Sequence, residues 1–500
     1  MIVPRPRSLT VCSGHFELTR QSSLYAPPAT AALVRELLSP ATGLPLPEAG
    51  GPGPDTLAFR LDDDCGLGPE GYRLTVTETG VDVVAATEVG LGWAVQTLRQ
   101  LLPAEVYASD PQLGVAWRLP CVEIADEPRY RWRGALLDVA RWCHPLPFLY
   151  RFVDLLAVHK LNTLHLHLTD DQGWRFEVHR YPLLTEVGGW RNESSAGHVS
   201  QGRFDHTRHG GFYTQDQLRD LVGYAARRGV RIMPEIDVPG HTQAAIAAYP
   251  RLGNEPSRRL PVRPEWGIST HVLNVEDATV SFVRDVLDEL VDVFPFEYVH
   301  VGGDEVPGDE WRASEAAQRR AAELGLPNVA GLLGWWTRQL ADHLRGYGRR
   351  VAVWDELLEH RPPHDATIFA WRGEQRVEAA RSGGFDVVAV PYTHTYLDWA
   401  ESDDADEPLA INGVLPLPKV YGYRPGDVLG VQGQLWSEYL PRTELVEWRA
   451  FPRLGAIAEV GWSEPGEYAE FERRATAHQE RLDVLGVRYR PVKPTSAVDF

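Results

Sequence analysis

From Arg131 onward the chain repeats one pattern, in which a short apolar run is followed by a longer stretch with helical periodicity. The apolar runs are four to seven residues long, and turn-forming residues bound most of them, as expected of strands. The pattern predicts eight strands, at Gly134–Val139, Thr163–Leu168, Val230–Ile236, Tyr298–Gly302, Val351–Trp354, Thr367–Trp371, Asp386–Val390 and Leu429–Leu435.

Helical segments separate most of these strands, and eight strands alternating with helices over about 330 residues predict an α/β fold, the (β/α)8 TIM barrel. A doubly wound sheet is the alternative, and it ranks lower because no Gly-rich phosphate loop follows the first strand. A last helix is expected at Glu467–Leu485, and a fraying tail from Arg488 to Phe500. The helices between the strands are predicted at Leu146–Val158, Gln215–Arg228, Thr279–Val293, Gly331–Arg345 and Glu444–Val460.

The first 124 residues have a different pattern, which predicts a small α+β support domain without chemistry of its own. Strands are expected at Thr56–Leu61, Tyr72–Thr77 and Val81–Ala85, and helices at Thr30–Leu38 and Leu91–Leu102. The predicted organisation is therefore a support domain over 1–124, a barrel domain with its C-terminal helix over 125–490, and a tail over 491–500.

Composition narrows the class of partner. A net charge of -19 argues against nucleic acid or an anionic membrane surface, because both select for basic protein surface. Sixteen Trp residues favour a sugar ligand, since indole faces stack on the apolar C–H surface of sugars. No apolar stretch approaches 18 residues.

The amino terminus indicates a compartment only weakly. Met1–Arg7 lacks an apolar region after its basic residues, so no secretory signal is visible. The four Cys residues are scattered without disulfide or metal spacing and are interpreted as free buried thiols. We therefore expect a cytoplasmic protein, or a secreted one if a leader has been removed.

Functional residues follow each predicted strand. In a barrel of parallel strands, the carboxyl ends of all the strands would lie around one mouth. Trp and Tyr side chains, several carboxylates, one Arg and one His would then form a pocket suited to a neutral, polyhydroxylated substrate. The groups are Asp138–Trp142, Thr169–Arg175, Pro234–His241, Asp304–Glu305, Trp354–Glu356, Trp371, Tyr392–Trp399 and Gln434–Glu438.

The central group is the run Tyr298–Glu305, which reads as a strand, two glycines and two adjacent carboxylates. Gly302 and Gly303 remove side chains where the strand ends, so another part of the chain or a ligand can come close. Consecutive Cα atoms lie only ~3.8 Å apart, so Asp304 and Glu305 cannot easily flank a sugar ring as the two carboxyls of a conventional glycosidase do.

Six motifs in order resemble glycoside hydrolase family 20, the β-N-acetylhexosaminidases, over nearly the whole chain. Three are His-Val-Gly-Gly-Asp-Glu at 300–305, Leu-Thr-Asp-Asp-Gln-Gly-Trp-Arg at 168–175 and Pro-Glu-Ile-Asp-Val-Pro-Gly-His at 234–241. The others lie at 97–103, 137–141 and 435–438. The resemblance implies exo-acting, retaining removal of terminal β-linked GlcNAc or GalNAc from a small glycan or glycoconjugate, with no cofactor and no metal.

The resemblance also implies a role for each site residue. Glu305 would protonate the glycosidic oxygen and later deprotonate water, while the substrate's own acetamido oxygen attacks and forms an oxazolinium ion. Asp304 would accept the acetamido N–H, and Tyr396 would donate to the acetamido oxygen. The pair that supports the acid would be Asp170 and His241. The aromatic box around the acetamido group would be formed by Trp354, Trp371 and Trp436. The sugar would be bound by Arg141, Asp398, Glu438 and His300.

Two rival interpretations remain open. His165-Leu166-His167 has a spacing used by metal-dependent hydrolases on this fold, although we prefer hydrogen-bonded core histidines. A non-catalytic sugar-binding protein on a decayed barrel is less favoured, because both carboxylates are present.

The sequence departs from the family at one place, and three further segments carry expectations. Some members have another sugar-facing Trp where this chain reads Glu407–Gly413, and Trp399 is the candidate replacement. The charge run Glu401–Glu407 is expected to be a solvated loop. Segments 176–213 and 250–275 are expected to rim the mouth.

Overall fold

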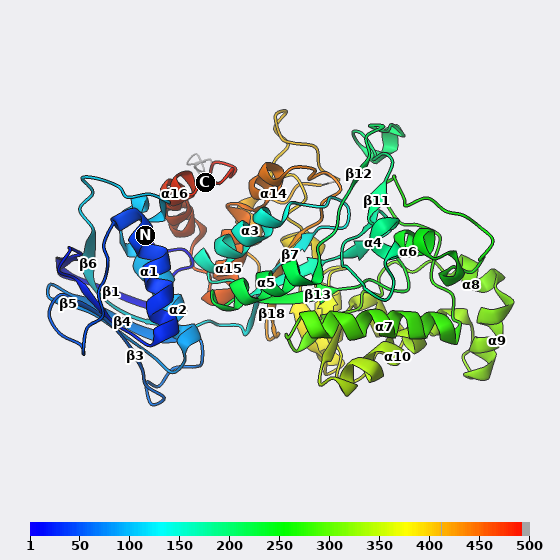
Figure 1. Ribbon diagram of the computed structural model, residues 1–500, viewed down its shortest axis with the longest axis horizontal. Helices are drawn as coiled ribbons and strands as arrows, with labels where there is room; N and C mark the ends of the chain where they lie inside the picture. Colours follow the sequence, from blue (N-terminus) through cyan, green and yellow to red (C-terminus); the bar gives the residue numbers. More distant parts are fainter. Residues whose placement is uncertain (412, 493–500) are drawn as a thin grey trace.

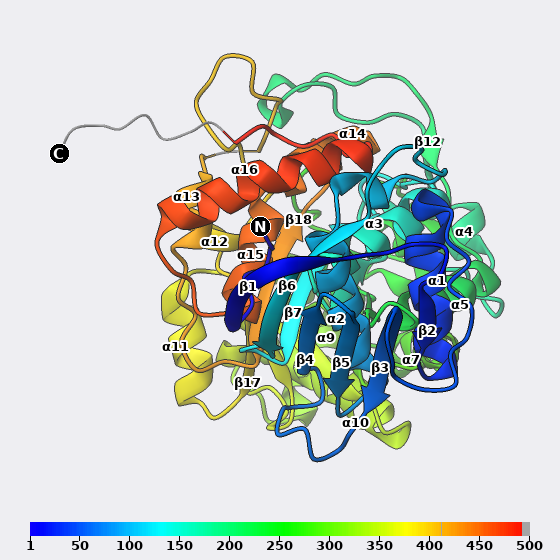
Figure 2. The same cartoon turned by 90° about the vertical axis from the view of Figure 1, so that its left-hand side faces the viewer.

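The computed structural model describes residues 1–411 and 413–492, which form an N-terminal sheet domain and a closed barrel (Figure 1). Helices α1 (Pro28–Thr42) and α2 (Glu88–Leu101) lie between the sheet and the barrel. Seen end-on, the strands of the N-terminal sheet lie in front of the barrel (Figure 2). The predicted fold class, a TIM barrel preceded by a small α+β domain, is confirmed.

The N-terminal sheet has six strands, in the order β1-β6-β4-β5-β3-β2. The three predicted strands match β3, β4 and β5, but β1, β2 and β6 were missed. In strand β1 polar and apolar residues alternate only over Ser8–Val11, where Leu9 and Val11 are exposed, and Phe16 is its one buried residue, so the sequence pattern is too short to identify a half-buried strand. The bounds are β1 Ser8–Glu17, β2 Ser23–Tyr25, β3 Thr56–Leu61, β4 Tyr72–Thr77, β5 Gly80–Ala85 and β6 Arg118–Asp126.

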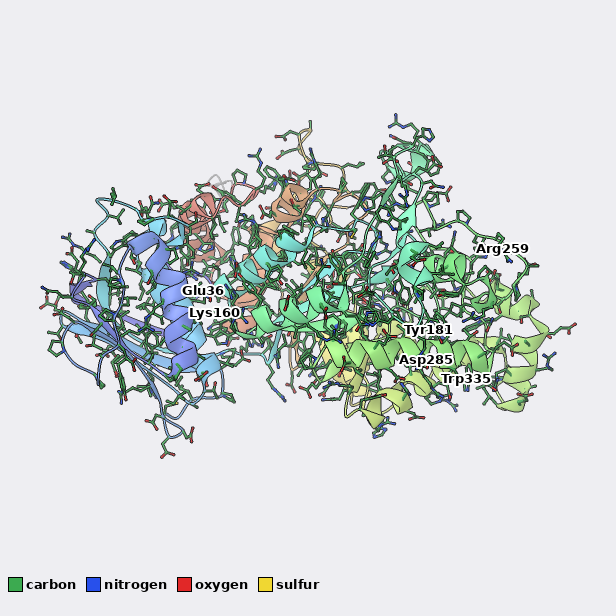
Figure 3. All side chains as sticks on the ribbon, viewed as in Figure 1. Glu36, Lys160, Tyr181, Arg259, Asp285 and Trp335 are labelled. Atoms are coloured by element: carbon green, nitrogen blue, oxygen red, sulfur yellow. The ribbon has the colours of Figure 1, made fainter. Side chains whose placement is uncertain are left out.

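A buried polar cluster joins the two domains at Asp126, the last residue of β6. The Lys160 ammonium lies 2.8 Å from the Asp126 carboxylate with both side chains fully buried, and Figure 3 shows Lys160 at the junction. Tyr72 and Trp462 also donate hydrogen bonds to this carboxylate. Because an unpaired buried charge is costly, this cluster holds the sheet domain against the barrel.

Eight parallel strands close the barrel, and each overlaps its predicted range. Parallel pairing places all eight carboxyl ends at one rim. The strands, in chain order, are β7 Trp132–Asp138, β8 Thr163–His167, β13 Arg231–Glu235, β14 Tyr298–His300, β15 Arg350–Trp354, β16 Thr367–Ala370, β17 Asp386–Ala389 and β18 Gly430–Leu435.

One predicted helix is in fact two. The expected helix Glu444–Val460 is divided into α14 (Thr443–Ala450) and α15 (Arg453–Trp462), because Pro452 has no N–H and cannot continue a helix. In the N-terminal domain, α1 ends four residues beyond the expected Thr30–Leu38, and α2 begins three residues before the expected Leu91–Leu102. The other predicted helices of the barrel domain begin and end within two residues of their expected bounds. They are α3 Leu146–Val158, α5 Gln215–Ala226, α7 Asp277–Val293, α10 Leu332–Gly346 and α16 Tyr468–Val484.

Short elements fill the connections, mostly on the side of the barrel rim. They are α4 Leu183–Glu186, α6 Gln243–Ala248, α8 Asp309–Ala313, α9 Glu315–Glu323, α11 Glu374–Ser382, α12 Tyr392–Thr395, α13 Leu417–Tyr421, and the strands β9 Thr169–Asp170, β10 Gly173–Trp174, β11 Trp190–Arg191 and β12 His209–Gly210.

The barrel interior changes character along its axis. Its amino-terminal part is filled by apolar and aromatic side chains, among them Trp132, Tyr298 and Phe369. Toward the carboxyl ends of the strands the buried side chains become polar, with His165, Glu235 and others at 0% exposure. These polar side chains lie beneath the mouth of the barrel.

The charge run Glu401–Glu407 was predicted to be a solvated loop, but part of it is buried. Glu401 and Glu407 are each 7% exposed at the side chain, and Glu407 lies 3.0 Å from Arg449. Arg490, expected in a fraying tail, lies 3.2 Å from Glu401. Local charge density did not reveal this, because the partners are far apart in sequence. Residues 493–500 of the expected tail, and Asn412, lie outside the described residues.

The expectation for the cysteines was partly wrong. All four are free, but Cys12 is exposed and only Cys121 is buried. Within the described residues, no helix is both long and apolar enough to cross a membrane.

Candidate active site

The turn after β14 presents Asp304 and Glu305 at the carboxyl rim of the barrel. Gly302 and Gly303 have φ values of +67° and +96°, which favour glycine, and Glu305 itself has a φ of +49°. A Cβ at Gly302 would lie 1.6 Å from the Asp237 carboxylate. The two glycines therefore allow the close approach that the sequence predicted, and the turn holds Glu305 in a strained backbone conformation of the kind found at functional sites.

Asp304 is a buried carboxylate that lacks part of its normal solvation. It is 9% exposed, and its Oδ1 has no hydrogen-bond partner among the described residues. Burial, reinforced by the nearby Asp237 carboxyl, raises the pKa of Asp304 well above its usual value, against the opposing effect of His241. A ligand N–H directed at Oδ1 would satisfy this oxygen.

Glu305 is more exposed and stands at the end of a chain of polar contacts. His241 Nε2 lies 3.5 Å from Glu305 Oε2 and 3.7 Å from Asp304 Oδ2. His241 Nδ1 lies 3.2 Å from Asp170 Oδ1. Burial alone would lower the pKa of His241, but Asp170 and Asp304 raise it well above its usual value. The structure thus brings together the four residues predicted as the acid, its neighbour and their supports.

Aromatic rings form a second wall of the site. Trp371 stacks on Tyr396 with ring centroids 6.1 Å apart, and Tyr396 lies 6.5 Å from Trp436. Trp354 lies beneath Trp436, at 5.9 Å, and is 1% exposed. Trp371, Tyr396 and Trp436 therefore form one continuous wall with Trp354 packed behind it, although the four residues come from four different strand ends.

Charged groups cluster on a third side of the site. Arg141 lies over the Trp436 ring at 5.2 Å, and its guanidinium is 2.9 Å from Asp170. Asp398 is 8% exposed with an unpartnered Oδ1; burial and the neighbouring Glu438 raise its pKa well above the usual value. Burial also raises the pKa of Glu438. These groups match the predicted sugar-binding set, whose role stays a prediction.

His300 does not reach the mouth, contrary to its assignment as a substrate-binding residue. It is fully buried within β14, and its Nδ1 lies 2.8 Å from Glu235 Oε1. A strand points alternate side chains to opposite faces, and His300 points into the barrel rather than toward the rim. The motif at 300–305 correctly identified the turn that carries Asp304 and Glu305. It did not indicate that its first residue, His300, lies below the mouth of the barrel.

The predicted core histidines are present as interpreted. His165 and His167 are 0% exposed, and both rings contact the Glu235 carboxylate. Trp399, the candidate additional sugar-facing residue, is half-buried and packs against Tyr392 at 5.7 Å. Its role stays a prediction.

The sequence analysis placed Glu356 at the end of a strand but assigned it no role; it follows β15 and contacts the aromatic wall. The Trp371 indole N–H lies 3.1–3.2 Å from both Glu356 oxygens. Burial, then Asp304 and Asp355, raises the pKa of Glu356 to about 8. The triplet Trp354-Asp355-Glu356 indicated that Glu356 lies at the end of a strand. Its contact with Trp371 could not be predicted, because that contact depends on how the ends of β15 and β16 lie relative to each other.

A Glu356→Gln variant is expected to lose less stability than the wild type as pH rises from 5 to 8. An unfolded glutamate has its pKa near 4.5, so between 4.5 and about 8 the folded chain keeps a proton that the unfolded chain releases. Wild-type stability should therefore fall by roughly 1.4 kcal/mol per pH unit relative to the variant. Melting temperatures at both pH values test this, with Glu359→Gln as control because its carboxylate is 55% exposed. A gap between Glu356→Gln and wild type that is independent of pH would contradict the assignment.

Comparison with known proteins places this geometry in a family. The model of the glycosyl hydrolase family 20 catalytic domain matches residues 130–465, and that of domain 2 of the same family matches residues 1–127. A β-hexosaminidase of Porphyromonas gingivalis is 37% identical over 522 aligned residues, which cover 100% of this chain and 66% of the relative. The chain thus spans slightly less than two thirds of that relative's length.

Two solved structures are similar over almost the entire chain. The family 20 β-N-acetylhexosaminidase of Streptomyces coelicolor A3(2) has a TM-score of 0.86 at 30% identity, covering 99% of this chain and 98% of that one. The family 20 exo-β-N-acetylglucosaminidase of Vibrio harveyi, in complex with N-acetylglucosamine, has a TM-score of 0.87 at 32% identity, covering 99% and 78%.

Proposed function

The chain belongs to glycoside hydrolase family 20, and from that membership we propose that it is an exo-acting, retaining β-N-acetylhexosaminidase. Its substrate is a small glycan or glycoconjugate that ends in β-linked GlcNAc or GalNAc. The observation that carries the proposal is the pair of adjacent carboxylates, one exposed and one buried with an unpartnered oxygen, beside an aromatic wall. The complex of the Vibrio harveyi relative with N-acetylglucosamine supports this class of ligand.

The first chemical step breaks the glycosidic bond. Glu305 gives its proton to the glycosidic oxygen, and the acetamido oxygen of the same sugar bonds to C1 as the leaving group departs. Asp304 accepts the acetamido N–H through Oδ1, which orients the group and stabilises the positive charge that develops on it. Because the nucleophile is tethered to the substrate, the protein needs no second carboxylate across the ring.

The second step restores the enzyme. Water attacks C1 of the resulting oxazolinium ion, the bond between C1 and the acetamido oxygen breaks and restores the acetamido group, and Glu305 takes the proton from that water as a general base. Two displacements at C1 give net retention of the β configuration. His241 and Asp170 keep Glu305 in place through both steps, and the Tyr396 hydroxyl donates to the acetamido oxygen.

The sugar-binding groups explain the exo preference. Hydroxyls of the non-reducing terminal sugar are bound by Arg141, Asp398 and Glu438. The glycan therefore cannot extend beyond this terminal sugar. Asp398 Oδ1 has no protein partner among the described residues and suits a substrate hydroxyl. The rings of Trp371 and Trp436, with Trp354 packed behind Trp436 at the base of the box, surround the acetamido methyl group and the sugar face.

Removal of the acetamido group is the direct test of this function. We expect p-nitrophenyl β-GlcNAc to be cleaved with a kcat/KM at least about 10³-fold higher than p-nitrophenyl β-glucoside, because the glucoside lacks the internal nucleophile. Proton NMR of the first product should show the β anomer. Comparable cleavage of both substrates, or release of the α anomer, would contradict the proposal.

A further inference from the structure

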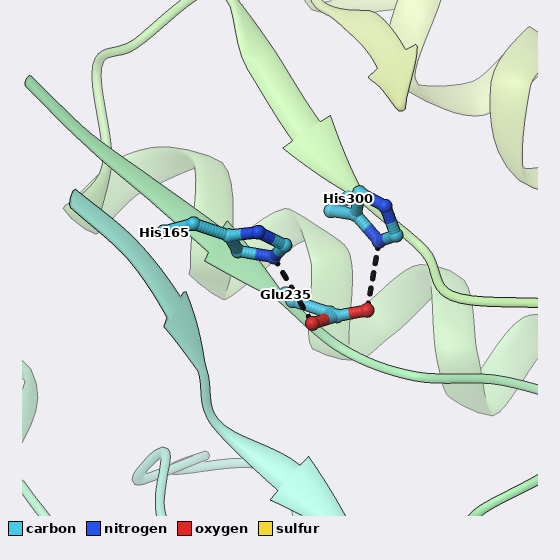
Figure 4. A group of neighbouring side chains, drawn as sticks. All are labelled: His165, Glu235 and His300. Atoms are coloured by element: carbon cyan, nitrogen blue, oxygen red, sulfur yellow. Dashed lines mark ion pairs between the residues drawn. The ribbon is translucent and has the colours of Figure 1, made fainter. Parts of the chain in front are cut away.

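A buried ionic layer lies under the active site and has no part in the mechanism described so far. Its centre is Glu235, the last residue of β13, which is 0% exposed. Figure 4 shows the imidazoles of His165 and His300 on either side of this carboxylate, each paired with a different oxygen. A buried carboxylate is costly unless it is fully paired, so the layer requires an explanation.

Every contact of Glu235 leads to a residue of the site or of the layer itself. Its Oε1 accepts from the Trp354 indole N–H at 2.9 Å and lies 2.8 Å from His300 Nδ1. Its Oε2 lies 2.5 Å from His167 Nδ1 and 3.0 Å from His165 Nε2. Burial would raise the pKa of Glu235, but the three histidines hold it well below its usual value. Glu235 is therefore an anion that also fixes one ring of the aromatic box.

His167 connects this anion to the acid of the proposed reaction. Its Nδ1 faces Glu235, and its Nε2 lies 2.9 Å from Asp170 Oδ2. An imidazole between two carboxylates donates from both nitrogens and is positively charged. Burial opposes that charge, but Glu235 and Asp170 raise the pKa of His167 well above its usual value.

Asp170 consequently has both oxygens occupied in a fixed arrangement. Oδ2 is held by His167 and by Arg141, each at 2.9 Å, which leaves Oδ1 for His241. The contacts form one alternating series of carboxylates and imidazoles, from Glu235 through His167, Asp170 and His241 to Glu305.

We propose that Glu235 and His167 are positioning residues, which hold Asp170 and, through His241, keep Glu305 placed for proton donation to the leaving group. The proposal rests on the function proposed above. It extends the support of the acid two residues deeper into the barrel. Neither residue touches the substrate, and both act through Asp170.

The two amide replacements of His167 separate its two contacts. In His167→Asn the amide reaches about as far as Nδ1, so it can still meet Glu235 but not Asp170. In His167→Gln the amide reaches about as far as Nε2, so it can still donate to Asp170. His165→Gln is the matched control, because His165 is equally buried and contacts the same Glu235, but its other ring nitrogen faces Gln432.

Leaving-group dependence distinguishes positioning of the acid from general damage to the fold. A 2,4-dinitrophenyl group departs with little protonation, whereas a methylumbelliferyl group, whose phenol is a much weaker acid than 2,4-dinitrophenol, depends more on the proton donor. We expect His167→Asn to lower kcat/KM for methylumbelliferyl β-GlcNAc by about 10²-fold and for the dinitrophenyl substrate by less than about fivefold. His167→Gln should recover part of this difference, and His165→Gln should lower both rates by the same factor.

The outcomes separate the two proposals. A wild-type protein that cleaves neither substrate removes the proposed function itself. If the wild type is active, the positioning role is overturned by a His167→Asn variant whose rates are unchanged, or whose rates fall by the same factor for both substrates. If His167→Asn does not fold, His167→Gln against His165→Gln decides the question, because a purely structural role predicts the same leaving-group response in both.

Discussion

Glu305→Gln is expected to abolish turnover of substrates with poor leaving groups. The replacement keeps the shape of the side chain but cannot give up a proton, so kcat/KM for methylumbelliferyl β-GlcNAc should fall by about 10³-fold or more. The loss should be much smaller for the dinitrophenyl substrate in its first step, because that bond breaks without acid. Steady-state and burst kinetics on both substrates measure the difference.

The chain offers a matched control for this variant in helix α8, which follows the turn that carries Glu305. Glu310 lies five residues further on, and its carboxylate is 2.7 Å from His271. Among the described residues, its other side-chain contacts are with Arg258, Asn254 and Val272, and it has none with His241 or Asp304. Glu310→Gln therefore removes a comparable Glu–His contact without touching the site, and should keep nearly full activity. Glu305→Gln activity within tenfold of wild type on the methylumbelliferyl substrate would show that another group is the acid.

Asp304→Asn is expected to have the second largest effect, of a different kind. The amide is neutral and cannot stabilise the positive charge of the oxazolinium, so kcat should fall by about 10² to 10³-fold for all leaving groups. A thiazoline that mimics this intermediate should also bind more weakly. Equal losses across leaving groups would separate the role of Asp304 from that of Glu305.

The stability of Asp304→Asn gives an internal control. Burial raises the pKa of Asp304 well above its usual value, so at neutral pH the folded state bears a cost for this carboxyl that an amide does not. The variant should therefore melt at a higher temperature than the wild type at pH 7, and the difference should shrink as the pH falls toward the unfolded value of 3.8. A variant that is inactive but less stable at pH 7 would point to misfolding instead.

The sequence alone was sufficient for the barrel and for the place of its site. Short apolar runs alternating with helices have few compact solutions, and in the parallel barrel all eight strand ends face one mouth. For this reason residues as distant as Arg141 and Glu438 could be assigned to one pocket. Gly302 and Gly303 likewise signalled a close approach, which the structure shows to be with Asp237 and Leu357.

Only the tertiary structure decided which of these residues reach the mouth and which lie beneath it. His300 and Glu235 belong to the same motifs as the site residues, yet both lie below the mouth, because strand register and depth decide exposure. Glu401 resembled a solvated acidic residue until Arg453 and Arg490 were found beside it.

The reason is the range of the interactions involved. Hydrophobic periodicity and turn residues act over a few positions, so a reader of the sequence can recognise them. Burial, charge pairing and pKa depend on distances between side chains that are far apart in the chain; His167 and Glu235, for example, are 68 residues apart but meet at 2.5 Å. Such contacts exist only after the barrel has closed.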